Sequence, residues 1–239
     1  LLTGERSGLT TEVTKAFRDS GASHILALSG LHLGIIYAII CKMLSITGNG
    51  KKMREVRSAL IIVTCGLYTL ATGAGASITR AYIFIVIKEI AEMTCRHASL
   101  KILLAAAAML HLAFDPTAAA DVGFQLSYAA IFGIAYIFPH LRNIWTNEWK
   151  GLRWIWESAA LSISCQLTTG PLAYCYFGTF PQYFLLTNLI AIPLAGMIIP
   201  AALLTTVLSA AGCCPDIVIT ITEWLTQTMY EALRIIASM

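Results

Sequence analysis

Charged residues are scarce in this sequence. Asp, Glu, Lys and Arg make up 12% of the 239 residues, whereas hydrophobic residues make up 57%. A soluble globular domain carries about 25% charged residues, so this composition excludes an ordinary soluble protein and predicts a membrane protein. The apolar runs recur along the whole chain, unlike a single N-terminal signal peptide. Because the sequence starts with Leu1 and stops within a helical pattern, we expect it to be a segment of a longer protein.

Sequence signatures of catalysis and of metal binding are also missing. The chain has no Walker phosphate-binding motif, no HEXXH zinc motif and no CxxC pair. Its five histidines are too dispersed to form a metal site by spacing, and its seven cysteines are scattered, mostly inside apolar runs, like other small apolar residues. We therefore expect no enzyme activity, no catalytic residue, no cofactor and no metal.

What is present is a series of apolar segments. A helix needs about 20 apolar residues to cross the ~30 Å hydrocarbon core of a bilayer. A hydropathy window of about 19 residues predicts an all-α polytopic membrane protein with seven or eight transmembrane helices, some of them broken by Pro or Gly. The predicted helices are residues 22–45, 58–74, 77–94, 100–115, 121–138, 154–176, 183–206 and 217–237.

The distribution of Lys and Arg predicts the orientation, because positively charged loops stay in the cytoplasm. Nine basic residues fall in three connections on one side, whereas the alternate connections "GAGAS", "DPTAAAD" and "FGTFPQY" contain none. We predict a multi-pass protein of the bacterial cytoplasmic (inner) membrane, with residues 1–21 on the outer side. The nine basic residues are Lys51, Lys52, Arg54, Arg57, Arg96, Lys101, Arg142, Lys150 and Arg153.

The two ends of the chain differ from the other segments. Residues 1–21 are too polar to span, and their apolar positions alternate with charges, which predicts an amphipathic helix at the outer interface. Residues 22–239 then form the transmembrane domain. The segment 217–237 has one polar helical face, so it either spans the membrane beside a polar cavity or lies flat on the surface. That polar face consists of Thr220, Glu223, Gln227, Glu231 and Arg234.

The segment "ALSGLHLGII" places polar residues inside the first predicted span. Ser29 and His32 share one helical face, and Gly30 and Gly34 form a GxxxG pair that lets another helix approach closely. The two polar side chains either hydrogen-bond to a neighbouring helix or line a polar cavity. A serine hydrolase would also need an oxyanion hole and a group that orients the imidazole, and the sequence has no nucleophile elbow.

Other polar residues interrupt later spans, and each needs a partner in hydrocarbon. Arg80 follows the small-residue turn "ATGAGAS". Its guanidinium either extends to the outer interface, toward Asp121, or binds an anion such as phosphate at the mouth of a water-filled path. Gln125, Gln166 and Asn188 lie in three further spans, the last two near prolines. Such spans are either packed within the protein or line a cavity. The second alternative favours a channel or transporter.

Four segments of the chain resemble the ComEC family of competence proteins. They are "GASHILALSGLHLGII", "GAGASITRAYIF", "DVGFQLSYAAIFGI" and "QLTTGPLAYCYFGTFPQYFLLTNLIAIPL". They occur in the family's order, and the similar blocks extend from about residue 4 to residue 207. Four ordered motifs are more specific than a single GxxxG pair.

The resemblance implies a DNA uptake function in natural transformation, as the inner-membrane channel domain that passes single-stranded DNA into the cytoplasm. Members of the family add an outer OB-like domain and often a metallo-β-lactamase-like domain, neither of which is in this sequence. The resemblance also implies three kinds of partner besides DNA: membrane lipid, an outer DNA receptor and a cytoplasmic helicase-like ATPase. The expected DNA path contains Arg80, His32, Ser29, Gln125, Gln166 and Asn188. The alternative is a small-solute or anion transporter of the cytoplasmic membrane, although the two halves show no convincing repeat.

Overall fold

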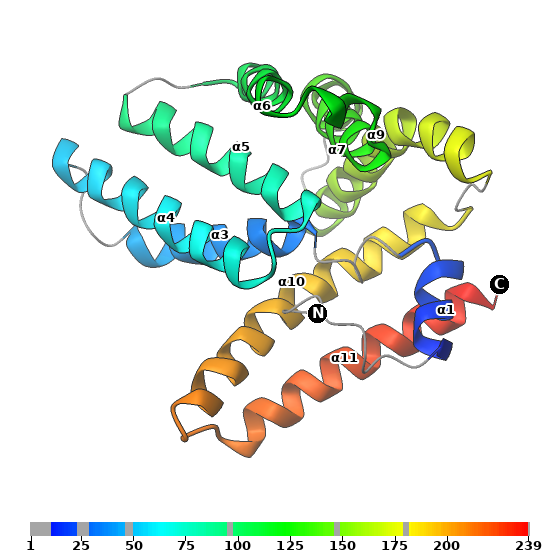
Figure 1. Ribbon diagram of the computed structural model, residues 1–239. Coiled ribbons are helices and arrows are strands. Elements are labelled where there is room, and N and C mark those ends of the chain that lie inside the picture. Colours follow the sequence, from blue (N-terminus) through cyan, green and yellow to red (C-terminus); the bar gives the residue numbers. More distant parts are fainter. Residues whose placement is uncertain are drawn as a thin grey trace. The chain divides into compact units, whose positions relative to one another are not determined.

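The computed structural model describes residues 11–22, 29–45, 50–94, 98–145, 149–178 and 182–238, and these residues contain helices and turns but no strand. The chain divides into two compact units (Figure 1). Unit 1 consists of Leu1–Ile35 and Pro181–Met239, and unit 2 of Ile36–Phe180. Residues 1–10 of the predicted interfacial segment lie outside the described residues.

Most of the helices are long enough to make several turns. In chain order they are α1 (Thr11–Asp19), α3 (Gly30–Leu44), α4 (Lys51–Ala71), α5 (Ala76–Met93), α6 (Leu100–Phe114), the 3₁₀ turn η1 (Pro116–Ala120), α7 (Val122–Phe132), the π-helical turn η2 (Gly133–Ile137), α8 (Phe138–Ile144), α9 (Lys150–Phe177), α10 (Phe184–Ala210) and α11 (Asp216–Ala237).

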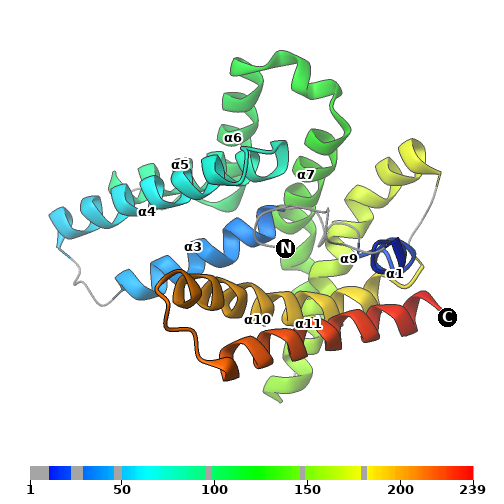
Figure 2. The same cartoon turned by 60° about the horizontal axis from the view of Figure 1, so that its bottom comes forward.

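Unit 1 is built on a pair of long helices. Figures 1 and 2 show α10 and α11 side by side and antiparallel, with α1 against α11. Phe17 of α1 is buried in the same apolar cluster as Ile198 of α10 and Leu233 of α11. The hydroxyl of Thr187 in α10 also donates a hydrogen bond of 2.7 Å to the carbonyl of Ser20. The amphipathic α1 is therefore anchored to the helix pair by its apolar face.

Unit 2 contains the second part of α3, from Ile36 on, and helices α4 to α9. Helix α4 packs against α5, α5 against α6 and α7, and α7 against α9. A tight turn joins α4 to α5, and Gly73 adopts a φ of 81° there, which glycine tolerates better than other residues. Two further glycines allow close approaches between helices. A Cβ at Gly66 would lie 2.8 Å from the hydroxyl of Tyr82, and a Cβ at Gly133 would collide with the backbone carbonyl of Ser164.

Most helices agree with those predicted from hydropathy, with three differences. The first predicted helix, 22–45, corresponds to α3, which begins at Gly30; residues 22 and 29 are not helical, and 23–28 lie outside the described residues. Helix α4 begins at Lys51, so the basic residues placed in a loop form its first turns, because Lys, Arg, Glu and Met are good helix formers. The predicted helix breaks at prolines were wrong: α9 continues through Pro171, and α10 continues through Pro193 and Pro200. Prolines are tolerated in apolar helices when the freed carbonyls find other partners.

The irregular backbone lies elsewhere. The π-helical turn η2 follows α7 directly and ends just before Pro139 in the first turn of α8. Proline has no N–H to donate to the preceding turn, and π-helical turns occur as local adjustments within α-helices. The helix from α7 to α8 therefore changes its pitch where Gly133 meets α9.

Two helical segments of the described chain are long and apolar enough to cross a membrane. They are Val122–Ile144, which combines α7, η2 and α8, and Phe184–Ala210, which is α10. Helices α3 and α6 are apolar but shorter, with 15 residues each. The other predicted spans contain more polar or charged residues, so the count of seven or eight spans stays a prediction.

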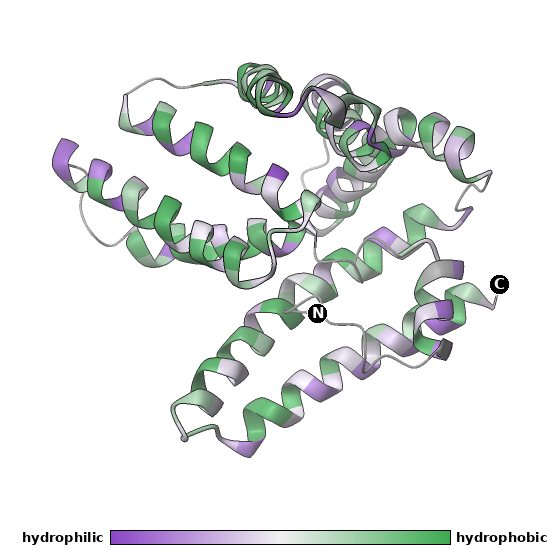
Figure 3. Ribbon diagram, in the orientation of Figure 1, coloured by the Kyte–Doolittle hydropathy of each residue, from purple (hydrophilic) through white to green (hydrophobic). Residues whose placement is uncertain are grey.

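Large apolar side chains are also exposed on the helix surfaces. On α4 they recur every three or four residues and form a stripe along one side of the helix: Met53, Val56, Leu60, Val63, Leu67 and Leu70. Figure 3 shows hydrophobic stretches along most of the helices. A continuous exposed apolar stripe is unfavourable in water and suits contact with lipid or with another protein.

Candidate functional site

Arg80 is the centre of a polar cluster in unit 2. The residue is buried, with 8% of its surface exposed, in the second turn of α5. Its Nε donates a hydrogen bond of 3.2 Å to the hydroxyl of Ser127 in α7. Its Nη1 lies 3.8 Å from Oδ1 of Asp121, whose side chain is 57% exposed. Arg80 therefore extends toward Asp121, which was the first of the two roles predicted for it from the sequence.

The guanidinium of Arg80 lies against the first turn of α7. Asp121 caps this helix, because its Oδ1 accepts a hydrogen bond of 2.7 Å from the backbone N–H of Phe124. A Cβ at Gly123 would lie 3.3 Å from Nη2 of Arg80 and 3.0 Å from Oδ1 of Asp121. Glycine at this position therefore leaves the room that the guanidinium occupies.

Gln125 belongs to the same end of α7 and is linked to a different helix. Its Nε2 donates a hydrogen bond of 2.9 Å to the carbonyl of Ala119 in η1. Its Oε1 accepts one of 2.8 Å from the hydroxyl of Tyr176, near the end of α9. The structure thus brings Arg80 and Gln125 to one end of α7, together with Asp121, Ser127 and Tyr176. We call these five residues the Arg80 cluster.

The Arg80 cluster has the chemistry of an anion site. Guanidinium presents several N–H donors in a planar fork that matches phosphate. One donor is used by Ser127, and within the described residues the terminal nitrogens have only the 3.8 Å ion pair with Asp121. An ion pair of this length leaves most hydrogen-bonding capacity of the terminal nitrogens unused. The carboxylate of Asp121 beside these nitrogens is exposed.

Ser29 and His32 form a local cap in unit 1. Ser29 precedes α3 directly and accepts a backbone hydrogen bond of 3.1 Å from His32. In return, Nδ1 of His32 accepts from the backbone N–H of Ser29 at 3.3 Å and lies 3.1 Å from its hydroxyl. The His32 side chain thus satisfies the N–H of the residue before the helix, which is one half of a capping box. The other half is not made, because the His32 N–H donates to the backbone carbonyl of Ser29 and not to its hydroxyl.

The imidazole of His32 is buried, with 1% of the residue exposed. Since Nδ1 accepts a hydrogen bond, the neutral ring carries its proton on Nε2. Nε2 has no hydrogen-bond partner within the described residues. Gly34 is exposed, and a Cβ there would meet no atom of its own unit within 4 Å. The close helix approach expected at Gly30 and Gly34 is thus not made at Gly34 by the described part of unit 1, whereas Gly66 and Gly133 make such approaches in unit 2.

The remaining predicted site residues are half-buried. Gln166 lies on α9 in unit 2, and Asn188 lies on α10 in unit 1. Three of the six residues expected in the DNA path, Arg80, Gln125 and Gln166, therefore belong to unit 2. The other three, Ser29, His32 and Asn188, belong to unit 1. The common path stays a prediction.

A second polar cluster in unit 2 was missed by sequence reasoning. The buried carboxylate of Glu89 in α5 accepts a hydrogen bond of 2.6 Å from the hydroxyl of Tyr37 in α3 and one of 2.7 Å from that of Ser58 in α4. Lys88 contacts the same Tyr37 hydroxyl and lies 3.8 Å from Glu89. Glu89 and Arg80 are nine residues apart, which puts them on opposite sides of α5. The two charges therefore reach different neighbouring helices.

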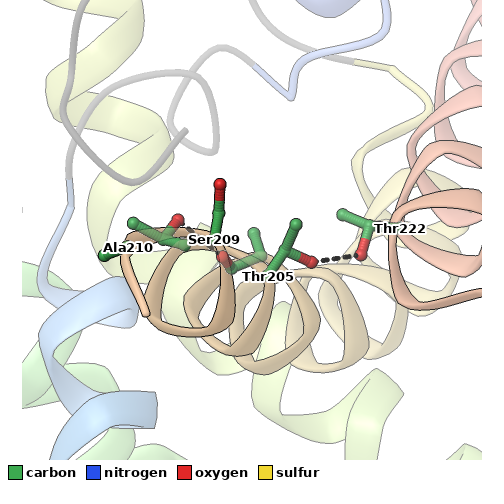
Figure 4. Close-up of a pocket in the computed structure, with 6 residues that line it drawn as sticks. Thr205, Ser209, Ala210 and Thr222 are labelled. Carbon is green, nitrogen blue, oxygen red and sulfur yellow. Dashed lines mark hydrogen bonds between the residues drawn. The ribbon is translucent and has the colours of Figure 1, made fainter. Parts of the chain in front are cut away.

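Unit 1 contains an open cavity of about 570 Å³ beside α10 and α11 (Figure 4). Its lining has no charged residue. The hydroxyls of Thr205 and Thr222 are 3.1 Å apart across it, and each also donates to a carbonyl of its own helix. The lining residues are Ala202, Thr205, Thr206, Ser209, Ala210 and Thr222. The cavity therefore lacks the positive charge that an anion requires.

Within the described ranges, no group of three His, Cys, Asp or Glu side chains is placed to hold a metal ion. Asp115, between α6 and η1, accepts hydrogen bonds from the hydroxyl and the backbone N–H of Thr117, at 2.5 and 3.0 Å. These bonds, the hydroxyl first, lower the pKa of Asp115 below its usual value of 3.8. Asp115 stabilises the turn that leads into α7.

Comparison with known proteins shows the family to which the chain belongs. The model of the family described as "Competence protein" matches residues 1–239, the entire sequence. The chain belongs to the competence protein family. Among curated proteins, ComE operon protein 3 of Bacillus subtilis (strain 168) is 26% identical over 196 residues. The match covers 81% of this chain but 24% of that protein, so the chain spans about a quarter of its relative's length. No solved structure matches the chain.

Proposed function

We propose that this chain is the transmembrane channel domain of a ComEC-type protein, which passes single-stranded DNA into the cytoplasm during natural transformation. The observation that carries the proposal is the match of the competence family to all 239 residues. Helices long and apolar enough to span a membrane and a buried arginine with unused donors support it.

The proposal places the chain in the bacterial cytoplasmic membrane with seven or eight spans and residues 1–21 on the outer side. The exposed apolar stripe on α4 supports contact with lipid. The first turns of the same helix are charged, so only its later part has the composition of a membrane span. The amphipathic α1 is held against α11, as an interfacial helix next to a span would be. In this orientation, Arg80 lies near the outer end of α5 and Glu89 near the inner end.

We propose that Arg80 binds phosphates of the entering strand near the outer mouth. DNA carries one phosphate per nucleotide, and proteins hold single strands through positive charge together with base stacking. When no ligand is bound, the guanidinium of Arg80 is paired with the exposed carboxylate of Asp121. A phosphate of the DNA strand can replace this carboxylate as the partner of the guanidinium. His32, Ser29, Gln125, Gln166 and Asn188 are the polar groups that we assign to the rest of the path.

The test is DNA import by variants of the full-length protein. Arg80→Glu should reduce import of labelled DNA by about tenfold or more, because charge-assisted hydrogen bonds contribute about 1.5–3 kcal/mol. Arg80→Lys should retain part of the activity, since it keeps the charge but loses the fork. Lys150→Gln serves as the control, because Lys150 is an exposed basic residue at the start of α9.

The amount of each variant in the membrane is measured alongside import, so that loss of protein is not mistaken for loss of function. Asp121→Asn adds a second test, because removal of the carboxylate should leave import intact or raise it. Unimpaired import by a normally abundant Arg80→Glu protein would remove Arg80 from the path.

The driving force and the delivery of DNA are assigned to partners. We propose a cytoplasmic helicase-like ATPase and an outer DNA receptor as these partners, and the family resemblance is what supports them. The same guanidinium would suit a small anion, so a transporter of small anions is the competing function. Binding of labelled phosphate or sulfate by the purified protein, without an effect of single-stranded DNA as competitor, would favour the transporter.

A further inference from the structure

Helix α11 presents three distinct faces. Its buried face packs within unit 1 and consists of Leu225, Met229, Leu233 and Ile236. These residues recur every three or four positions and therefore lie along one side of the helix. Leu225, Met229 and Leu233 belong to the apolar cluster that also contains residues of α1 and α10.

A second face is apolar but exposed. It carries Ile217, Ile221, Trp224 and Ile235, which are between 49% and 68% exposed. At 100° per residue, this face is turned away from the buried one by about a quarter of the helix circumference. Helix α10 has comparable exposed apolar residues, among them Met197, Leu204 and Val207. The two neighbouring helices thus share the kind of surface that contacts lipid.

The third face is polar and lies opposite the buried one. Gln227 Nε2 donates a hydrogen bond of 3.2 Å to Oε1 of Glu231. Arg234 Nη2 lies 2.8 Å from Oε2 of the same carboxylate. Thr220 and Glu223 continue this face toward the start of α11, and both are exposed. Figure 3 shows the resulting alternation of hydrophilic and hydrophobic colours along α11.

The arrangement of the three faces bears on whether α11 spans the membrane or lies flat on its surface. A helix that lies flat on a membrane needs one apolar face for lipid and one polar face for water. Helix α11 instead has two apolar faces, one packed on its neighbours and one exposed, and it runs antiparallel beside α10 for most of its length (Figures 1 and 2). Helix α11 carries more charged residues than the two apolar segments that are candidates to span, but α10 beside it is one of them. If α10 spans, a helix packed antiparallel along it is directed across the membrane as well.

We propose that α11 spans the membrane and that its polar face lines a water-filled cavity. Carboxylates within a span are costly in hydrocarbon and face water or protein instead. The proposal rests on the membrane placement in the proposed function, but it does not depend on DNA as the transported molecule.

The charge on the polar face of α11 determines whether it attracts cations or anions. Arg234 and Glu231 neutralise each other, whereas Glu223 has no ion pair within the described residues. The cavity wall is therefore negative near Glu223. A carboxylate about 6 Å from a reacting group changes the local concentration of a monovalent ion by about threefold in water. This wall favours cations and supplies no phosphate ligand beyond the paired Arg234.

Single cysteines in the full-length protein test the proposal in intact cells. The native cysteines are replaced by serine, and membrane-impermeant thiol reagents are added without DNA. Gln227→Cys and Thr228→Cys form a matched pair, because the two positions are adjacent near the middle of α11 but lie on different faces. Gln227→Cys should react at least about tenfold faster, since the reactive thiolate is strongly disfavoured in lipid.

Sidedness separates a spanning helix from a flat one. A cysteine at Ser238 should react from outside, whereas Cys213, restored in the turn before α11, should react only after permeabilisation. A cationic reagent should also outpace an anionic one at Gln227→Cys, relative to a free thiol. Glu223→Gln should lower that ratio by about ninefold, because the carboxylate raises the concentration of the cation about threefold and lowers that of the anion by the same factor.

Reaction of both ends from the same side would refute the spanning placement. Equal, slow reaction at positions 227 and 228 would refute the water-filled cavity. Because the labelling needs no DNA, failure of DNA import in the same cells would count against the proposed function alone.

Discussion

Replacing Gly133 by alanine should destabilise the contact between α7 and α9. Gly133 is buried at the start of the π-helical turn. A Cβ there would collide with the carbonyl oxygen of Ser164 and would lie 2.7 Å from the hydroxyl of Thr168. The threonine side chain can rotate, but the carbonyl belongs to the backbone of α9, so the helices themselves must move apart.

The expected cost follows from two opposing effects. Extra volume in a packed interior costs about 1–3 kcal/mol when the neighbours have to shift. Alanine instead of glycine in a helix offsets about 0.5–1 kcal/mol of this. The net loss should be about 1–2 kcal/mol, which lowers the melting temperature of a protein of this size by about 2–8 °C.

Cys165 provides the readout at the same contact. Its Sγ lies 4.0 Å from the carbonyl oxygen of Ala130 in α7. The thiol is partly buried between the two helices, so it reacts slowly with a reagent in solution and faster once the helices separate. With the other cysteines replaced by serine, a fluorogenic thiol reagent reports the opening temperature of the purified protein in detergent. Gly196→Ala is the control, because its added methyl group meets no atom within 4 Å.

The prediction requires Gly133→Ala to melt below both the parent protein and the control. Equal melting of Gly133→Ala and Gly196→Ala would show that α7 and α9 do not approach each other as described.

Two further predictions concern polar contacts outside the Arg80 cluster. Glu89→Gln should lower the free energy of unfolding by about 1–3 kcal/mol, because the Ser58 hydroxyl loses a charged acceptor. Thermal unfolding of the purified protein measures this loss. An equal loss in Glu92→Gln, a variant on the same helix, would contradict the prediction. For Asp115, the lowered pKa means that its stabilising contribution is complete above about pH 4 and is lost as the pH falls through its folded pKa. Thr117→Val should weaken this acid dependence, so parallel loss of stability in both proteins between about pH 5 and pH 2.5 would refute the assignment.

Hydropathy predicted the helices well because it reports how side chains partition between apolar and polar surroundings. The predicted segments 77–94 and 100–115 coincide with α5 and α6 to within one residue at each end. The breaks expected in α9 and α10 were predicted from the N–H that proline lacks, and both helices continue through their prolines. Hydropathy carries little information on backbone hydrogen bonds, so it missed the π-helical turn. It also placed Lys51 in a loop, since charge and helix propensity are independent properties.

The polar sites were predictable only in part. The outer turn suggested that Arg80 extends toward Asp121, and the structure places their charged atoms 3.8 Å apart. The partnership of Glu89 with Tyr37 joins residues 52 positions apart, and no local pattern shows which helices become neighbours. The capping role of Ser29 and His32 was within reach of the sequence, because the two residues have the spacing of a capping box.

The most direct measurement is the amount of labelled duplex DNA that becomes DNase-protected single strand in the cytoplasm. Cells with and without the full-length gene are compared, and surface-bound DNA is measured in parallel. The account predicts that cells without the gene retain surface-bound DNA but contain no protected strand. Equal amounts of protected strand in both cell types would contradict the channel function.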